Sequence, residues 1–475
     1  MLNRNIDALA CKWIEENRDG VIADWMNLCR IPSVVSDPVG DAPFGLPAKE
    51  VLCFVDGLYK KYGLNSRNED NYYLISEYGS GDKRIGVFGH ADVVPGGDGW
   101  IYTTPFEPVI IKNTLIGRGV EDNKAGVMAS LVAVRILRDM DIPLGSVVQG
   151  FVGSAEEVGM EDISTFLERE IMPDFSLVPD SSFPCCIGEK GIFRIFAKCR
   201  EGYTAIKEFK GGECINAVTD KTVARIAFSD ALYNEMLSRG EIERITVERE
   251  GDVIVVTAKG ISAHASTPES SINASYLLSG FLEGLEALPE GDRSIMKTVN
   301  HLLSDTTGKV LGIAFSDDIF GALTAANGMA FCKDGHLNLT FDVRYGKDHD
   351  GAWVEKNISK TLDTYGFDAY DGDDMKAIYL DPKSEMAIGL TDIYREISEC
   401  PEAKPFCMGG KTYASMLQNA IAIGTFVDKE RDEPEMPAGH GGVHSPDEKI
   451  SIDGFFEAVR VLVQYIVFID KQLNK

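Results

Sequence analysis

The sequence is short of basic residues and has no long apolar run. Lys and Arg number 47 against 74 Asp and Glu, which gives a formal net charge of −27, and no Lys/Arg block interrupts this balance. Such a surface repels nucleic acid and anionic membranes. No run of about 18 apolar residues occurs, and the first residues lack the apolar core of a signal peptide. We therefore expect a cytoplasmic protein that binds neither nucleic acid nor membrane.

Paired cysteines and a phosphate-binding loop are also missing. The ten cysteines are scattered without a Cys-x-x-Cys pair, and the adjacent Cys185 and Cys186 have a geometry that usually prevents a bridge. Residues 409–412 read Gly-Gly-Lys-Thr, but a P-loop needs glycine five residues before the Gly of Gly-Lys, where this chain has Pro405. We therefore expect reduced thiols and no nucleotide site.

One predicted strand ends in a histidine and a carboxylate. Residues 85–89 are mostly apolar and predict a buried strand, which His90 and Asp92 follow directly before a Gly- and Pro-rich turn. An isolated His-x-Asp is most often a core histidine that a carboxylate satisfies. The pair indicates a functional site only if other such groups accompany it.

Acidic residues stand at several comparable places downstream. Asp122 lies between a Gly-rich loop and an apolar helix expected over residues 127–137, where by itself it indicates a helix cap. Glu156 and Glu157 follow an apolar strand, and Asp180 ends another. Strand ends that present acids, with helices between the strands, predict an α/β domain whose site lies at the carboxyl edge of the sheet.

The pattern changes near residue 188 and returns near residue 384. Between them lie predicted strands without regular βαβ spacing, at 191–200, 244–250, 253–259 and 336–344, and helical patterns at 220–238 and 272–288. We therefore predict a catalytic α/β domain over residues 1–187 and 384–475, with an α+β domain inserted at residues 188–383.

Polar residues also stand out in these later parts. Asn216, His264 and Arg344 are each open to a structural interpretation, as a turn cap, an exposed loop histidine and a strand-end salt bridge. His440 and His444 follow in a Gly-rich acidic loop.

Five residues together offer a metal-ligand set of two imidazoles and three carboxylates: His90, Asp122, Glu157, Asp180 and His444. Nitrogen and oxygen donors without thiolate suit Zn²⁺, Mn²⁺ or Co²⁺, and five ligands are enough for two ions if one carboxylate bridges them. The spacing alone does not show that they converge.

The motifs that carry these residues resemble those of the M20 metallopeptidases, in the same order. They read His-Ala-Asp-Val-Val-Pro, Gly-Arg-Gly-Val-Glu-Asp-Asn-Lys-Ala-Gly, Ala-Glu-Glu-Val-Gly, Val-Pro-Asp, Ser-Ala-His-Ala-Ser-Thr-Pro-Glu and His-Ser-Pro-Asp-Glu. The length and the insertion are most similar to the PepV-type dipeptidases, also described as Xaa-His dipeptidases or carnosinase-like enzymes. The resemblance runs from about residue 10 to the C-terminus.

The resemblance implies a dinuclear metal site. Asp122 would bridge two divalent ions, Zn²⁺ before Mn²⁺ or Co²⁺, with His90 and Asp180 on one ion and Glu157 and His444 on the other. His444 is preferred to His440 because Glu448 follows it at the family spacing. The fold implied is that of the dinuclear metal aminopeptidases, a mixed sheet flanked by helices, and the insertion would be a lid.

The resemblance also implies the catalytic roles. Asp92 would orient His90, Glu156 would act as the general base towards a hydroxide that bridges the metals, and His264 would bind the developing oxyanion. A cis peptide is expected between Asp122 and Asn123.

Substrate binding would fall to Asn216 and Arg344 together with Gly410 and Thr412 of the late glycine loop, where Arg344 suits the carboxylate of a dipeptide. This loop and the motifs also depart from the family pattern. The departures are Lys411 for glycine, Ser415 for arginine, Asn123 where Asp is frequent and Asp447 where Asn is frequent.

We therefore predict a metallodipeptidase that acts on small peptides as a monomer. An N-acyl-amino-acid amidohydrolase is the alternative within the family, and a catalytically silent metal-binding homologue is the alternative outside enzymes.

Overall fold

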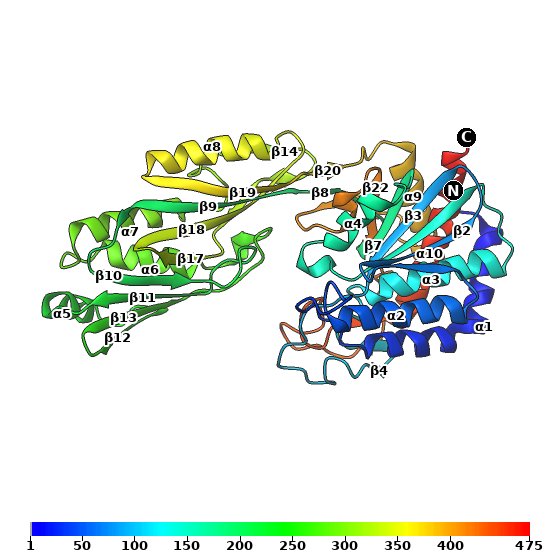
Figure 1. Cartoon of the computed structure of the whole chain (residues 1–475), viewed down its shortest axis with the longest axis horizontal. Coiled ribbons are helices and arrows are strands. Elements are labelled where there is room, and N and C mark those ends of the chain that lie inside the picture. Colours follow the sequence, from blue (N-terminus) through cyan, green and yellow to red (C-terminus); the bar gives the residue numbers. More distant parts are fainter. Residues whose placement is uncertain (1) are drawn as a thin grey trace. The chain divides into compact units, whose positions relative to one another are not determined.

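The computed structural model describes residues 2–475, which form two compact units (Figure 1). Unit 1 contains the chain up to Ile187, Leu380–Phe406 and Lys411–Lys475. Unit 2 contains Gly188–Tyr379 and Cys407–Gly410. Most of unit 2 is therefore an insertion into unit 1, and the chain leaves and re-enters unit 1 at adjacent residues, because Leu380 N donates to Ile187 O at 2.7 Å.

Unit 1 is an α/β unit, as the sequence predicts. Its elements are α1 (Arg4–Cys29), α2 (Leu46–Lys61), β1 (Ser66–Glu69), β2 (Tyr73–Gly79), β3 (Lys83–His90), β4 (Val109–Ile111), β5 (Thr114–Ile116), α3 (Lys124–Asp139), β6 (Ser146–Gly153), η1 (Glu156–Val158), α4 (Glu161–Arg169), β7 (Phe175–Ser181), β8 (Cys186–Glu189), α9 (Glu385–Ser398), β21 (Phe406–Met408), η3 (Tyr413–Met416), β22 (Ala420–Gly424), β23 (Lys449–Ser451) and α10 (Ile452–Leu473).

The main sheet of unit 1 is mixed and has the strand order β1-β2-β6-β3-β7-β22-β8. The four strands β6, β3, β7 and β22 are parallel, whereas β1, β2 and β8 pair antiparallel to their neighbours. The parallel strands are buried along most of their length. This burial explains why they read in the sequence as mostly apolar runs. Helices α3 and α10 pack together against this sheet, and α1 packs on both (Figure 1).

Unit 2 is an α+β unit. Its elements are β9 (Gly191–Gly202), β10 (Ile206–Gly211), β11 (Lys221–Ala227), α5 (Asp230–Ser238), β12 (Ile245–Glu250), β13 (Val253–Lys259), η2 (Pro268–Ser270), α6 (Ala274–Glu283), α7 (Glu290–Leu302), β14 (Ser316–Asp317), β15 (Gly321–Ala322), β16 (Thr324–Ala326), β17 (Ala330–Lys333), β18 (His336–Tyr345), α8 (Gly351–Thr364), β19 (Phe367–Met375) and β20 (Ile378–Tyr379).

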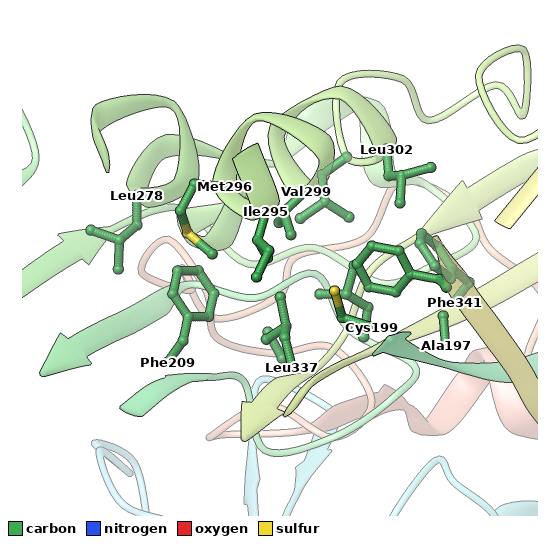
Figure 2. Packing of buried hydrophobic residues seen from close by; sticks show 14 of the residues in the cluster. Ala197, Cys199, Phe209, Leu278, Ile295, Met296, Val299, Leu302, Leu337 and Phe341 are labelled. Carbon is green, nitrogen blue, oxygen red and sulfur yellow. The ribbon is translucent and has the colours of Figure 1, made fainter. Parts of the chain in front are cut away.

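Unit 2 has its own hydrophobic core. The sheet order is β12-β13-β11-β10-β17-β18-β9-β19, and helices α6 and α7 cover one face of it. Figure 2 shows Leu278 of α6 and Met296 of α7 directed at Phe209 of β10 and Leu337 of β18. A separate core of this kind allows the insertion to fold as a domain.

One prediction of secondary structure is wrong. Residues 220–238 read as one helix, but residues 221–227 form β11, and only residues 230–238 form a helix. Thr222, Ala224 and Ile226 alternate inward along β11, and the small side chains concealed that period of two.

No helix within residues 2–475 is both long enough and apolar enough to span a membrane.

Candidate metal centre

The carboxyl edge of the parallel strands brings His90 and Asp180 together. Val87 of β3 pairs with Leu177 of β7, so the residues three positions further on, His90 and Asp180, stand at the same level of the sheet. His90 Nε2 lies 3.8 Å from Asp180 Oδ2. The side chain of His90 is almost fully buried.

Asp122, from the turn between β5 and α3, lies between two groups of donors. Its Oδ1 is 3.2 Å from His90 Nε2, and its Oδ2 is 3.0 Å from His444 Nε2. His444 Nε2 is also 3.0 Å from Glu157 Oε1. The Asp122–Asn123 peptide is cis, as expected from the resemblance.

The structure therefore gathers all five predicted ligands into two groups that share Asp122. The first donor group is His90, Asp122 and Asp180, and the second is Asp122, Glu157 and His444. Within each group the donor atoms lie within 4.8 Å of one another. His440 belongs to neither group, because its Nδ1 lies 2.6 Å from Asp447 Oδ2.

This arrangement fits a pair of divalent cations. His90 Nε2 is buried and makes no hydrogen bond of good geometry within residues 2–475, although it faces two carboxylates. A buried imidazole nitrogen that faces carboxylates without a hydrogen bond is suited to bind a cation. Two imidazoles and three carboxylates, one of them shared, match the donors of two-metal hydrolytic sites.

The five residues of the two donor groups, which together form the donor cluster, affect one another's pKa. Burial would lower the pKa of His90, but the carboxylates of Asp122 and Asp92 outweigh it and raise that pKa well above its usual range. Hydrogen bonds with Asp122 and Glu157 raise the pKa of His444 to about 10. Burial opposes ionisation of Asp122, yet the two imidazoles hold its pKa below the ordinary value. The cluster is thus built around cationic charge, which bound metal ions would also supply.

Glu156 stands beside the cluster but belongs to neither donor group. Burial, with a smaller contribution from nearby carboxylates including Asp180 and Glu157, raises its pKa well above the ordinary value. A carboxyl group whose ionisation is opposed by burial holds a proton more readily than an exposed one, which suits a general acid and base.

Asp92 contacts both the histidine and the turn that follows β6. The His90 ring Nδ1 lies 3.1 Å from the Asp92 backbone carbonyl oxygen and 3.4 Å from its carboxylate. The two Asp92 carboxylate oxygens accept hydrogen bonds from Glu156 N and Glu157 N at 3.2 and 3.1 Å. A partner for Nδ1 leaves Nε2 directed at the donor cluster.

Several positioning residues were not identified from the sequence. Asn123 accepts from His90 N at 3.2 Å and donates to Asp180 Oδ1 at 2.7 Å, so it links both ends of the first donor group. Glu448 is fully buried, pairs with Arg118 at 2.7 Å and accepts from the backbone N–H of Asp122 at 3.1 Å. In the sequence, the only sign that Glu448 belongs to the site is its position close to His444.

The residues predicted to contact substrate lie mostly in unit 2. Asn216 and His264 are neighbours there, because Ala265 N donates to Asn216 O at 2.9 Å and Ala217 forms a β-bridge with His264. His264 Nδ1 lies 2.7 Å from Ser266 Oγ. The roles proposed for Asn216 and His264 stay predictions.

The guanidinium of Arg344 is already engaged within unit 2. It is buried and donates to both carboxylate oxygens of Asp342, at 2.5 and 3.0 Å, and to Gly409 O at 2.8 Å. Gly410 follows in the same unit. In unit 1, the hydroxyl of Thr412 accepts from Ala414 N at 3.1 Å. Substrate binding by these residues stays a prediction.

Comparison with known proteins agrees with this architecture. A family model described as Peptidase family M20/M25/M40 matches residues 86–467 of the chain. A Staphylococcus aureus (strain USA300) protein named as a dipeptidase is 26% identical over 470 residues, which cover 95% of this chain and 97% of that protein.

Two solved structures share the fold. The di-peptidase Dug1p from Saccharomyces cerevisiae aligns with a TM-score of 0.57 and 13% identity over 98% of each chain. Human carnosine dipeptidase 1 aligns with a TM-score of 0.56 and 15% identity, over 98% of this chain and 99% of that chain. At these identities the structures establish the fold alone.

Proposed function

Because the chain belongs to peptidase family M20/M25/M40, we propose that it is a metallodipeptidase that hydrolyses the amide bond of dipeptides at the donor cluster around Asp122. The relatives that match nearly the whole chain carry dipeptidase names, which favours a short peptide as the substrate.

One observation carries the proposal: two donor groups share the carboxylate of Asp122, and a further carboxyl group, that of Glu156, stands beside them next to the ligand Glu157. Two divalent cations at such a site acidify a water molecule and polarise the scissile carbonyl. Zn²⁺ suits mixed imidazole and carboxylate donors, and we propose it as the native metal.

The residues of the chain supply the remaining steps. Glu156 takes the proton of the attacking water on a carboxylate oxygen and later delivers it to the nitrogen of the leaving amine. Asp92 holds the ring of His90 and, through two N–H groups, the turn that carries Glu156. His264 is assigned to the developing oxyanion, and Asn216 with Arg344 to the substrate.

The decisive experiment replaces Glu156 by glutamine, which keeps the size of the side chain and removes its proton chemistry. Loss of general acid and base catalysis costs about 10²- to 10⁴-fold in kcat, so Glu156→Gln should lose at least 100-fold on dipeptides. The measurement combines steady-state kinetics on a dipeptide panel with metal analysis, because the variant should still hold two cations. Glu161→Gln, on the exposed start of α4, is the matched control and should keep full activity.

Other outcomes separate the rival functions. Cleavage of N-acyl amino acids but not of unblocked dipeptides would identify a deacylase. If Glu156→Gln hydrolysed dipeptides as fast as the unaltered chain, the assignment of Glu156 as the general base would be wrong. A metal-loaded protein that hydrolyses neither class of substrate would be a silent homologue. We also propose a cytoplasmic monomer, and gel filtration tests the oligomeric state.

A further inference from the structure

The turn that carries Glu156 and Glu157 is bound along its backbone by two carboxylates. The four consecutive N–H groups of residues 154–157 all donate to them. Asp92 accepts the last two, as described above. Asp162, from the first turn of α4, accepts the first two on its Oδ2, at 2.7 and 2.8 Å. Asp162 and Asp92 thus fix this turn together. Asp162 was not among the predicted site residues.

Tyr413 completes this arrangement from a distant part of the chain. Its hydroxyl donates to Asp162 Oδ2 at 2.5 Å, and both side chains are fully buried. Burial of the carboxylate raises the pKa of Asp162 to about 6. A charged acceptor buried in this way is stable only when donors surround it, and the Tyr413 hydroxyl is one of them.

The ring of Tyr413 also contacts a predicted metal ligand. It stands edge-on to the imidazole of His90, with centroids 6.2 Å apart and an interplanar angle of 89°. Phe151, on β6, also stands edge-on to the tyrosine ring, with centroids 5.4 Å apart. Tyr413 therefore contacts a histidine of the first donor group directly and the Glu157-bearing turn through Asp162.

The sequence makes room for this pair at the end of β6. A Cβ atom built on Gly153 would collide with both Tyr413 Oη and Asp162 Oδ2. Gly153 is also the residue that pairs with His90 across the sheet, and its carbonyl accepts from Ala91 N at 2.9 Å. Glycine at this position thus permits the pair to reach the turn.

We propose that Asp162 and Tyr413 are positioning residues that set the geometry of Glu156 and Glu157 without touching the substrate. The hydroxyl of Tyr413 orients the carboxylate of Asp162, and this carboxylate fixes the backbone from which the general base and one metal ligand extend. This inference rests on the proposed function for the role of Glu156, but not for the position of Glu157.

The test removes the hydroxyl alone. Tyr413→Phe should lower kcat for a dipeptide by about 10- to 100-fold, the usual effect of losing a partner of a metal site, while KM changes less than about twofold. The protein loaded with Co²⁺ should still hold two ions, but its visible absorption spectrum should change because the carboxylate of Glu157 is displaced. Asp162→Asn combined with Tyr413→Phe should be no worse than Asp162→Asn alone, because both changes break the same contact.

Tyr465→Phe is the matched control. Tyr465 is another fully buried tyrosine of unit 1, and its hydroxyl donates to Pro184 O at 2.8 Å. This variant should lose a comparable amount of stability but keep the kcat and the Co²⁺ spectrum of the unaltered protein. If Tyr413→Phe is unfolded by circular dichroism, Asp162→Asn, which weakens the same contact by removing the negative charge of the acceptor, is compared with Tyr465→Phe instead.

The outcomes separate this inference from the proposed function. If Tyr413→Phe matches Tyr465→Phe in both kcat and spectrum, the pair is merely structural and the inference is wrong. A changed spectrum with unchanged kcat would overturn the part that concerns Glu156. A protein without dipeptidase activity whose spectrum still responds to Tyr413→Phe would contradict the proposed function and support the positioning of Glu157.

Discussion

Asp122 differs from the other predicted ligands because it belongs to both donor groups. Its two carboxylate oxygens face different histidines, at 3.2 and 3.0 Å. Asp180 belongs to the first donor group only. The consequences of losing one carboxylate should therefore differ between these two residues.

We predict that Asp122→Asn reduces the bound metal from two ions towards none, because both groups lose their shared anionic ligand. Asp180→Asn should retain one ion tightly and bind the other at least about 10-fold more weakly, because losing a direct ligand costs no less than losing an outer partner of one. Calorimetric titration of the metal-free protein with Zn²⁺, followed by metal analysis, gives both numbers. Equal losses in the two variants would contradict a shared role for Asp122.

At the residue scale, the sequence could indicate the ligands but not the residues that hold them. His90, Glu157 and Asp180 stand at or just after the ends of apolar strands, which indicated a site at the sheet edge, and the family resemblance then grouped them as ligands. Asp162 looks like an ordinary acidic residue at the start of a helix. Its importance depends on a contact with Tyr413, 251 positions away, which no local pattern encodes.

At the scale of elements, the turn between β5 and α3 is held by a segment from the other end of the chain. Glu448, just before β23, accepts from the N–H groups of Gly119, Glu121 and Asp122 at 3.0 to 3.1 Å. It also pairs with the buried Arg118. The strand β23 pairs with β5 and so brings Glu448 to this turn.

We predict that Glu448→Gln lowers the free energy of unfolding by about 3 kcal/mol, because it leaves the buried guanidinium of Arg118 without a counter-charge. Urea unfolding of the metal-free protein measures this change separately from metal binding. The control is Asp41→Asn, which breaks the exposed pair with Lys49 and should have no measurable effect. Equal stability of the two variants would mean that Glu448 does not hold the turn.

The elements that the sequence could predict are those whose hydrophobic residues follow a strong pattern. The strands buried on both faces and the apolar helices α3 and α10 stood out because burial leaves few polar residues in them. The strand β11 did not, since its inward residues are mostly small and polar residues surround them. The shapes of the turns that follow β5 and β6 could not be predicted either, because carboxylates from other segments of the chain hold them.

At the scale of the whole molecule, the predicted ligands lie in one unit and most of the predicted substrate residues lie in the other. All five ligands lie in unit 1, whereas His264, Asn216 and Arg344 lie in unit 2. The chain leaves unit 1 at Ile187 and returns at Leu380, which are joined by a hydrogen bond in the antiparallel register that β8 and β20 continue. We therefore expect that removing the insertion separates metal binding from catalysis.

We predict that replacing residues 188–379 by a two-residue hairpin turn leaves a folded protein that binds two Zn²⁺ ions. Such a turn spans two antiparallel neighbours without strain, and the ligands keep their own sheet. Dipeptide hydrolysis should fall by at least about 100-fold, the usual loss when an oxyanion donor is removed.

His264→Ala in the full chain is the matched control and should lose a similar factor while it binds both ions. Metal titration and steady-state kinetics measure metal binding and dipeptide hydrolysis in the two proteins. If the shortened chain cleaves dipeptides at the full rate, unit 2 takes no part in catalysis; if it binds no metal, the donor cluster needs unit 2.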